Sequence, residues 1–164
     1  MAQIRFDQIV YQVMKYAPTQ LMNAAFARAK FMGLRRDLDG RYYARAQTWS
    51  TKIFDKRLGR FVSKSSYTKY DTFIMIHPYK TRRTTIVLSC SCPDFLYRHE
   101  VALYKRGGAE VEYSNGRLPK ITNPRLRATC CKHCLRFYID LSRRFPQLFA
   151  EQRDLEQAIG TNNS

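Results

Sequence analysis

The residues best suited to chemistry are the cysteines, all five of which lie between residues 90 and 134. Two of them belong to the stretch SCSC, and the other three share the stretch TCCKHC with a histidine. Thiolates and imidazoles are ligands that zinc prefers, whereas magnesium and calcium take oxygen. A Cys-x-Cys pair and a Cys-x-His pair together supply four ligands. We therefore predict a structural zinc site with the ligands Cys90, Cys92, Cys131 and His133.

Other uses of these thiols compete with zinc. The number of cysteines is odd, no secretory signal is recognisable, and the neighbours Cys130 and Cys131 could pair only with strain, so a disulfide framework is disfavoured. A Cys–His nucleophile would need an orienting group and an oxyanion site, for which the sequence offers no context. Inert buried thiols remain the main alternative. Cys130 and Cys134 are spare ligands, and Cys134 in place of His133 is the more favourable exchange.

A predicted hairpin and a helix would position these ligands. Stretches 72–76 and 84–88 are mostly apolar or β-branched, and the second strand leads into Cys90 and Cys92. Side chains two apart on a strand point to one face, so this pair makes half of a site. A helix is predicted to begin at the second cysteine stretch and to end at Pro146.

The segment between the two cysteine stretches is predicted to hold a helix from Pro93 to Gly107 and a short hairpin around Asn115-Gly116. His99 and Glu100, within that helix, are expected to form a surface pair. After Pro146 a short last helix is predicted to reach about Ile159.

The N-terminal part is predicted to hold two helices. Apolar residues at helical spacing follow Phe6, and Pro18 should end the first helix. Thr19 can cap a second helix that Gly33 would terminate. Beyond it, Asp39-Gly40 is a turn signal, and residues 52–63 predict a small hairpin with Gly59 in its turn.

The pattern Cys90-x-Cys92 … Cys131-x-His133 resembles the SWIM-type zinc finger, whose signature is Cys-x-Cys followed by Cys-x-His. The resemblance covers about residues 71–140, and it implies that a β-hairpin gives the first pair and a helix start the second. Here 38 residues separate the two pairs, more than the usual spacer, so the intervening helix and hairpin would be an insertion. The stretches PDFLYRHE, YSNGRLPKITNP and CCKH further resemble small tailed-bacteriophage proteins with such a finger. That resemblance implies a protein of the virion.

The charge balance points to a polyanionic partner. Lys and Arg number 29 against 13 Asp and Glu, which gives a formal net charge of +16. Such a balance favours DNA or acidic neighbouring proteins, although a merely solvated basic surface is the competing explanation. Basic residues near aromatic ones supply the candidate contacts: Arg35, Arg36, Arg41, Arg45, Lys52, Lys56, Arg57, Arg60, Lys80, Arg82 and Arg83.

The predicted fold is α+β: an N-terminal helical pair, a small antiparallel sheet, and a zinc knot joining a β-hairpin to a C-terminal helix. Residues 1–70 would form a basic helical and hairpin part, 71–145 the zinc-binding part and 146–164 a helical tail, all in one compact domain. We expect no membrane span and no small-molecule substrate.

The expected function is that of a non-enzymatic, zinc-stabilised structural protein of a phage particle. Its expected partners are other virion proteins, with DNA as a further candidate. Its expected location is the virion or the host-cell cytoplasm. A freestanding nucleic-acid-binding protein is the alternative. An enzyme using Cys131 or His133 is the least favoured hypothesis.

Overall fold

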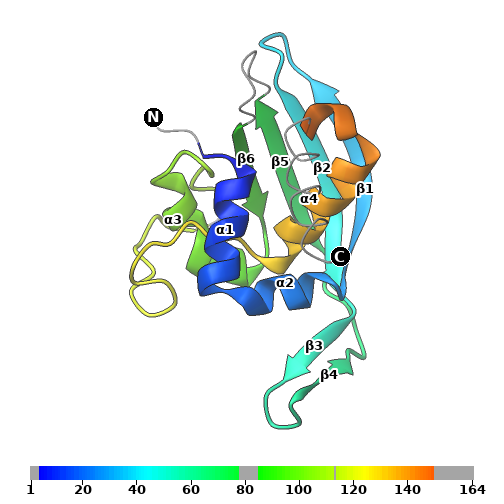
Figure 1. Cartoon of the computed structure of the whole chain (residues 1–164), viewed down its shortest axis with the longest axis vertical. Helices are drawn as coiled ribbons and strands as arrows, with labels where there is room; N and C mark the ends of the chain where they lie inside the picture. The colour runs from blue at the N-terminus through cyan, green and yellow to red at the C-terminus, as the bar shows by residue number, and fades with distance from the viewer. Residues whose placement is uncertain (1–3, 78–84, 113, 150–164) are drawn as a thin grey trace, which may run out of the picture.

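The computed structural model describes residues 4–77, 85–112 and 114–149, and it has an α+β fold (Figure 1). A four-stranded antiparallel sheet of order β1-β2-β5-β6 contains Ala27–Arg36, Tyr42–Ser50, Tyr70–His77 and Thr85–Cys90. The predicted pairing of the last two of these strands is confirmed. The helices α1, α2 and α4 lie over the same face of this sheet, which we call the inner face (Figure 1).

The N-terminal helical pair consists of α1 (Phe6–Tyr16) and α2 (Pro18–Ala24). Pro18 occupies the first position of α2, where its missing N–H is not needed, so Thr19 is not the cap. The predicted extension of this helix to Gly33 is wrong. From Ala27 onward, buried or half-buried residues alternate with exposed ones, and this period of two suits a strand rather than a helix. Gly33 lies at a register irregularity between β1 and β2.

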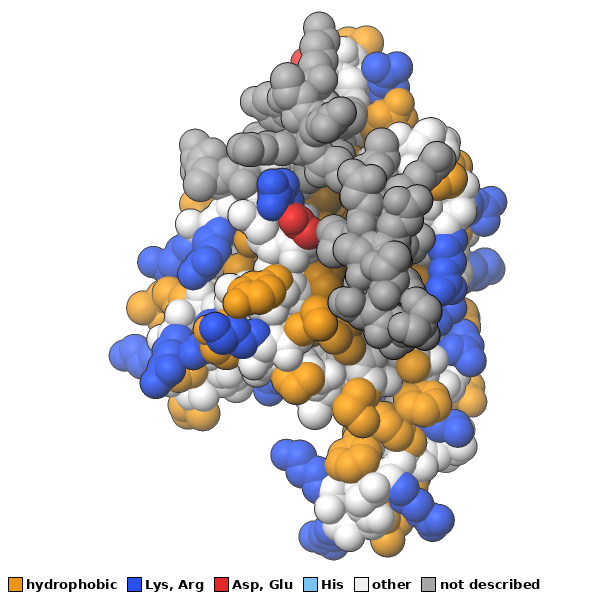
Figure 2. All heavy atoms as spheres, in the orientation of Figure 1, with side chains coloured by type: hydrophobic (Ala, Val, Ile, Leu, Met, Phe, Trp, Pro, Cys, Tyr) orange, Lys and Arg blue, Asp and Glu red, His pale blue; other side chains and the backbone are white. Residues whose placement is uncertain are grey.

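Both turn signals in the first half are confirmed. The turn between β1 and β2 contains Gly40 with φ of +81°, and the carboxylate of Asp37 accepts a hydrogen bond from the N–H of Arg41 at 2.8 Å. Residues 52–63 form a separate two-stranded sheet, β3 (Lys52–Asp55) and β4 (Arg60–Ser63), which projects from the body (Figure 1). Hydrophobic side chains gather where this hairpin joins the body (Figure 2), among them Phe26 and Phe61 with ring centroids 4.3 Å apart.

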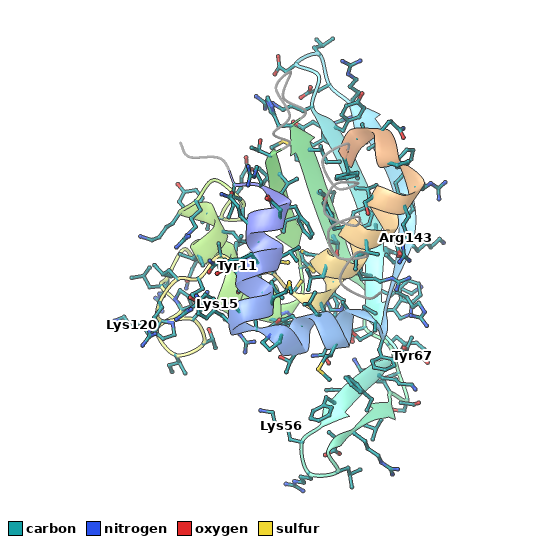
Figure 3. The ribbon with its side chains drawn as sticks, viewed as in Figure 1. Tyr11, Lys15, Lys56, Tyr67, Lys120 and Arg143 are labelled. Carbon is teal, nitrogen blue, oxygen red and sulfur yellow. The ribbon has the colours of Figure 1, made fainter. Side chains whose placement is uncertain are left out.

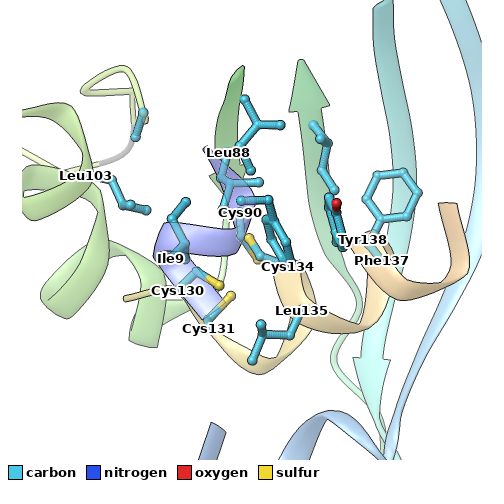
Figure 4. Close-up of a cluster of buried hydrophobic side chains, with 14 of the residues drawn as sticks. Ile9, Leu88, Cys90, Leu103, Cys130, Cys131, Cys134, Leu135, Phe137 and Tyr138 are labelled. Carbon is cyan, nitrogen blue, oxygen red and sulfur yellow. The ribbon is translucent and has the colours of Figure 1, made fainter. Parts of the chain in front are cut away.

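The hydrophobic core lies between the inner face and α4 (Lys132–Arg144), which contacts all four strands. The rings of Phe6 on α1 and Tyr138 on α4 are stacked, with centroids 3.3 Å apart. The buried cluster draws on side chains from Ile4 to Phe149. Figure 4 shows that cysteines are part of this core, beside Ile9 and Leu135.

The segment between the cysteine stretches is only partly as predicted. A π-helical turn, η1 (Phe95–His99), continues into α3 (Glu100–Tyr104), and Gly107 with φ of +70° follows its end. The hairpin predicted around Asn115-Gly116 is wrong, because the described residues between α3 and α4 form no strand. Their backbone is held differently: the N–H groups of Glu112 and Ser114 both donate to the buried carboxylate of Glu100.

The chain after α4 turns at Pro146 into a short 3-10 helix, η2 (Pro146–Phe149). The rest of the predicted last helix, up to Ile159, lies outside the described residues. Within the described part of the chain, none of the helices has the length and apolar character needed to cross a membrane.

Candidate metal centre

The four predicted ligands converge. One ligand atom from each of Cys90, Cys92, Cys131 and His133 lies within 4.8 Å of the others, and all four side chains are buried. In a tetrahedral zinc site the ligand atoms lie roughly 3.3–3.8 Å apart, so the separations between them are close to those that a zinc ion needs. None of the five cysteines forms a disulfide. The group can therefore hold a metal ion.

The local structure explains how the ligands are presented. Cys90 is the last residue of β6 and Cys92 lies two residues beyond it, so one strand end carries both thiols to the same side. Cys131 is the N-cap of α4 and His133 lies in its first turn. Two donors point at the sulfurs: the hydroxyl of Thr72 at 3.5 Å from Cys90 Sγ and the N–H of Phe95 at 3.4 Å from Cys92 Sγ. Donors of this kind favour the thiolate form, which is the form that binds metal.

The histidine has one ring nitrogen engaged and one without a partner. Nε2 of His133 is hydrogen-bonded to Oγ of Ser50 at 3.1 Å. Nδ1 is buried and has no hydrogen-bond partner among the described residues. A buried polar atom without a partner is costly, and a metal ion bound by Nδ1 would remove that cost. A hydrogen bond from the second ring nitrogen is the usual way in which proteins orient a ligating histidine.

The thiols differ in acidity. Burial alone would raise the pKa of Cys90, but hydrogen bonds from Cys131 and Cys134 lower it well below its usual value. The hydrogen bond with Cys131 lowers the pKa of Cys92, yet the neighbouring Cys90 and burial raise it overall. Burial raises the pKa values of Cys131 and Cys134 well above the usual range. A divalent cation bound by the cluster would favour the thiolate form of its cysteines.

The two spare cysteines occupy different places. Cys134 is buried and hydrogen-bonds to Cys90 and Cys131, so it borders the cluster without belonging to the four converging residues. Cys130 is buried as well, and burial together with the negative charge of Asp94 raises its pKa. His133 rather than Cys134 is therefore the fourth member of the group.

A buried polar network beside the centre is not as predicted. His99 and Glu100 are both fully buried, so the predicted surface pair is wrong. His99 Nδ1 lies 3.0 Å from Oγ1 of Thr129, and its Nε2 lies 3.3 Å from Oδ2 of Asp94. These two partners lie two residues from Cys131 and Cys92 respectively, so the network ties the two ligand-bearing segments together. No signal in the sequence indicated this contact, because residues five apart do not face each other on an α-helix and Asp94 and His99 meet here through the π-helical turn.

Gln20 of α2 extends this network to the start of α4. Its amide donates to Asp94 at 2.7 Å, and its carbonyl oxygen accepts from the N–H of Lys132 at 3.1 Å. Burial would raise the pKa of Asp94, but the hydrogen bond from His99 and the charges of His99 and Arg98 lower it to about 2. Helix α2 therefore helps to hold the two segments that carry the candidate ligands, a role that its apolar spacing did not indicate.

The basic residues predicted as contacts fall into two described groups. Arg35, Arg36, Arg41 and Arg45 lie on the β1–β2 hairpin, whose turn is at the upper end of the view in Figure 1. Lys52, Lys56, Arg57 and Arg60 belong to the β3–β4 hairpin at the opposite end, where Lys56 is labelled in Figure 3. Lys80, Arg82 and Arg83 lie outside the described residues. The described contacts thus form two separate basic regions.

Comparison with known proteins finds no matching family model, no matching curated protein and no matching solved structure.

Proposed function

We propose that the Cys90, Cys92, Cys131 and His133 group binds one structural zinc ion. The observation that carries the proposal is the unpartnered, buried Nδ1 of His133 beside three converging cysteine sulfurs. Three sulfurs and one nitrogen suit zinc, and four protein ligands leave no coordination position for water or substrate. The ion would fasten the end of β6 to the start of α4, and its role would be structural rather than catalytic.

We further propose that the protein is a non-enzymatic structural component of a bacteriophage particle. Support comes from the resemblance of its cysteine pattern to the SWIM-type finger and of its short motifs to phage proteins. Metal binding can supply on the order of 10 kcal/mol of folding free energy, which would make a small subunit rigid without a larger core. In this role the basic regions would meet DNA or acidic neighbouring subunits.

A freestanding nucleic-acid-binding protein is the second candidate. The net charge of +16 and the position of the basic side chains on two hairpins favour it. It predicts tight binding to duplex DNA at low salt, with a loss of about 10³–10⁵ in affinity between 50 and 200 mM salt if roughly 6–10 phosphates are contacted. Negligible binding at the low-salt end would reject DNA as the partner.

The zinc proposal is tested by elemental analysis of protein purified without added metal, and by cobalt substitution. We expect one zinc ion per chain, and a cobalt-bound spectrum with the sulfur-to-metal charge-transfer bands of thiolate ligation. A strong chelator should lower the unfolding temperature reversibly. The proposal would be contradicted if the purified protein contained no metal and if the chelator left its unfolding temperature unchanged. Mass spectrometry of purified phage particles tests the virion role separately.

A further inference from the structure

The four-stranded sheet has a second face, turned away from α4, which we call the outer face. Along β2 the residues Ala44, Ala46, Thr48 and Ser50 are buried on the inner face, and those between them are half-buried or exposed. Strand β5 alternates in the same way. Because successive side chains point to opposite faces, Tyr43, Trp49 and Phe73 lie on the outer face. Aromatic rings on a sheet face away from the core call for an explanation.

The register places a cation beside each of these rings. Arg35 is opposite Tyr43 and Arg45 is opposite Phe73 in the pairing of neighbouring strands. The guanidinium carbons of Arg35 and Arg45 lie 5.7 and 5.4 Å from the two ring centroids. Arg28 is opposite Trp49, and Nζ of Lys69 lies 5.6 Å from the centroid of the Trp49 ring. The outer face is therefore an array of rings interleaved with positive charges.

The charge of this array is strongly one-sided. Lys30, opposite Gln47, adds a further exposed cation to Arg28, Arg35, Arg45 and Lys69. Two carboxylates lie among them: Asp71, which is paired with Arg45 at 3.1 Å, and Asp37, which accepts a hydrogen bond from the Tyr43 hydroxyl at 3.2 Å. At the β6 edge, Glu112 accepts a hydrogen bond from Ser89. Tyr43 and Trp49 are six residues apart on one strand, or about 20 Å. A long, negatively charged ligand with flat, stackable groups complements this surface.

We propose that the outer face binds single-stranded nucleic acid, with bases stacked on Tyr43, Phe73 and Trp49 and phosphates paired with the surrounding cations. Unpaired bases expose the planes that aromatic side chains need, whereas bases in a duplex stack on one another. The inference rests on the second candidate function, a nucleic-acid partner, and specifies its form and binding surface. It differs from the sequence-based contact set, because Phe73, Arg28, Lys30 and Lys69 were not part of that set.

The chain carries its own reporter for this surface, since Trp49 is its single tryptophan. The zinc-loaded full chain is titrated with oligo(dT), oligo(U) and a DNA duplex, all of about 16 nucleotides in length, and with heparin as a polyanion without bases. We expect both single strands to quench the Trp49 fluorescence and to bind at least tenfold more tightly than the duplex. Heparin should leave the fluorescence close to its initial level. A difference between oligo(dT) and oligo(U) identifies DNA or RNA as the preferred source.

Variants assign the binding to the face. Phe73→Leu keeps an apolar side chain for packing but removes the ring, and loss of one stacked base should weaken oligo(dT) binding roughly 5- to 150-fold. Tyr43→Ala should weaken binding to a similar extent. Trp49→Phe keeps a ring and should still bind oligo(dT); because this variant lacks the tryptophan, its binding is measured by the fluorescence anisotropy of a labelled strand. Tyr67→Ala is the matched control, because Tyr67 is exposed near the β3–β4 hairpin (Figure 3) and should leave affinity unchanged. Circular dichroism and zinc content confirm that each variant is folded.

The outcomes separate the inference from the function on which it rests. The inference is supported if single strands quench the Trp49 fluorescence and if only the Tyr43 and Phe73 variants lose affinity for oligo(dT). Equal binding to duplex and single strands, unchanged by these variants, overturns it and leaves the nucleic-acid candidate with the hairpins as its contacts. Absence of binding to all nucleic acids overturns both.

Discussion

Ser50, the last residue of β2, is hydrogen-bonded through its hydroxyl to Nε2 of His133 on α4, at 3.1 Å. The two residues are 83 positions apart in the chain, and both are buried. A strand without any predicted ligand thus orients the imidazole that we propose as the nitrogen ligand. Because Ser50 engages Nε2, the nitrogen left available to a metal is Nδ1, which is buried and has no hydrogen-bond partner among the described residues.

Ser50→Ala should weaken zinc binding by about 10- to 100-fold, because the imidazole loses the partner that fixes its orientation. Competition with a chromophoric chelator measures the zinc affinity of both proteins. Ser63→Ala, an exposed serine at the end of β4, serves as the control. Equal affinities for Ser50→Ala and the parent protein would show that Ser50 does not orient the ligand.

The adjacent cysteines should respond differently to the same substitution. Cys131→Ala removes one of the four converging ligands, so the purified protein should lose stoichiometric zinc and much of its stability. Cys130→Ala removes a buried thiol outside the four and should retain one zinc ion per chain. Elemental analysis of the two variants decides the matter, and the reverse pattern would assign Cys130 as the ligand.

His99→Phe should destabilise the fold by about 2–3 kcal/mol, since the Asp94 carboxylate and the Thr129 hydroxyl lose a buried partner while the volume is nearly kept. Arg98→Ala is the matched control. Arg98 pairs with the same aspartate at 3.4 Å but is partly exposed, so its loss should cost less than about 1 kcal/mol. Denaturant unfolding of both variants in excess zinc gives the comparison. If the two substitutions lowered the free energy of unfolding equally, the hydrogen bonds of His99 would not stabilise the fold more than an exposed ion pair does.

Asp37 should titrate below the ordinary range of an aspartate. Burial raises its pKa, but hydrogen bonds from the Arg41 N–H and the Tyr43 hydroxyl and the charge of Arg41 lower it overall. A lowered folded-state pKa means that the carboxylate stabilises the β1–β2 turn fully above its unfolded pKa of about 3.9, and that this contribution is lost as the pH falls through the folded-state value. Carbon-detected NMR titration measures it, and a pKa at or above the usual value would be inconsistent with the turn geometry.

The convergence of Cys90, Cys92, Cys131 and His133 was predictable from the sequence, because the Cys-x-Cys and Cys-x-His spacings depend on local structure alone. A strand end and a helix start each place two ligands, and the pairing of β5 with β6 follows from two runs of β-branched residues. The existence of the two N-terminal helices followed from the spacing of Phe6, Ile9 and Val13 and from the position of Pro18.

What the sequence did not predict depends on tertiary contacts. Residues 27–36 have apolar side chains at spacings that suit a helix as well as a strand, and pairing with β2 decides between them. His99 and Glu100 are polar, so their burial is favourable only with hydrogen-bond partners from distant parts of the chain. Thr129 supplies a partner for His99, and the backbone N–H groups of Glu112 and Ser114 supply partners for Glu100. The same backbone contacts replace the expected hairpin around Asn115-Gly116.

The wide separation of the two ligand pairs has a consequence for biosynthesis. Cys92 leaves the ribosome 39 residues before Cys131, a delay of about 2–8 s at ordinary translation rates. During that interval the inner face of the sheet lacks α4, and Phe6 lacks the ring of Tyr138 on which it stacks. The nascent chain must therefore keep its first two thiols reduced and its apolar sheet face shielded during that interval. The packing of α4 against the sheet and the convergence of the four candidate ligands then belong to the same step.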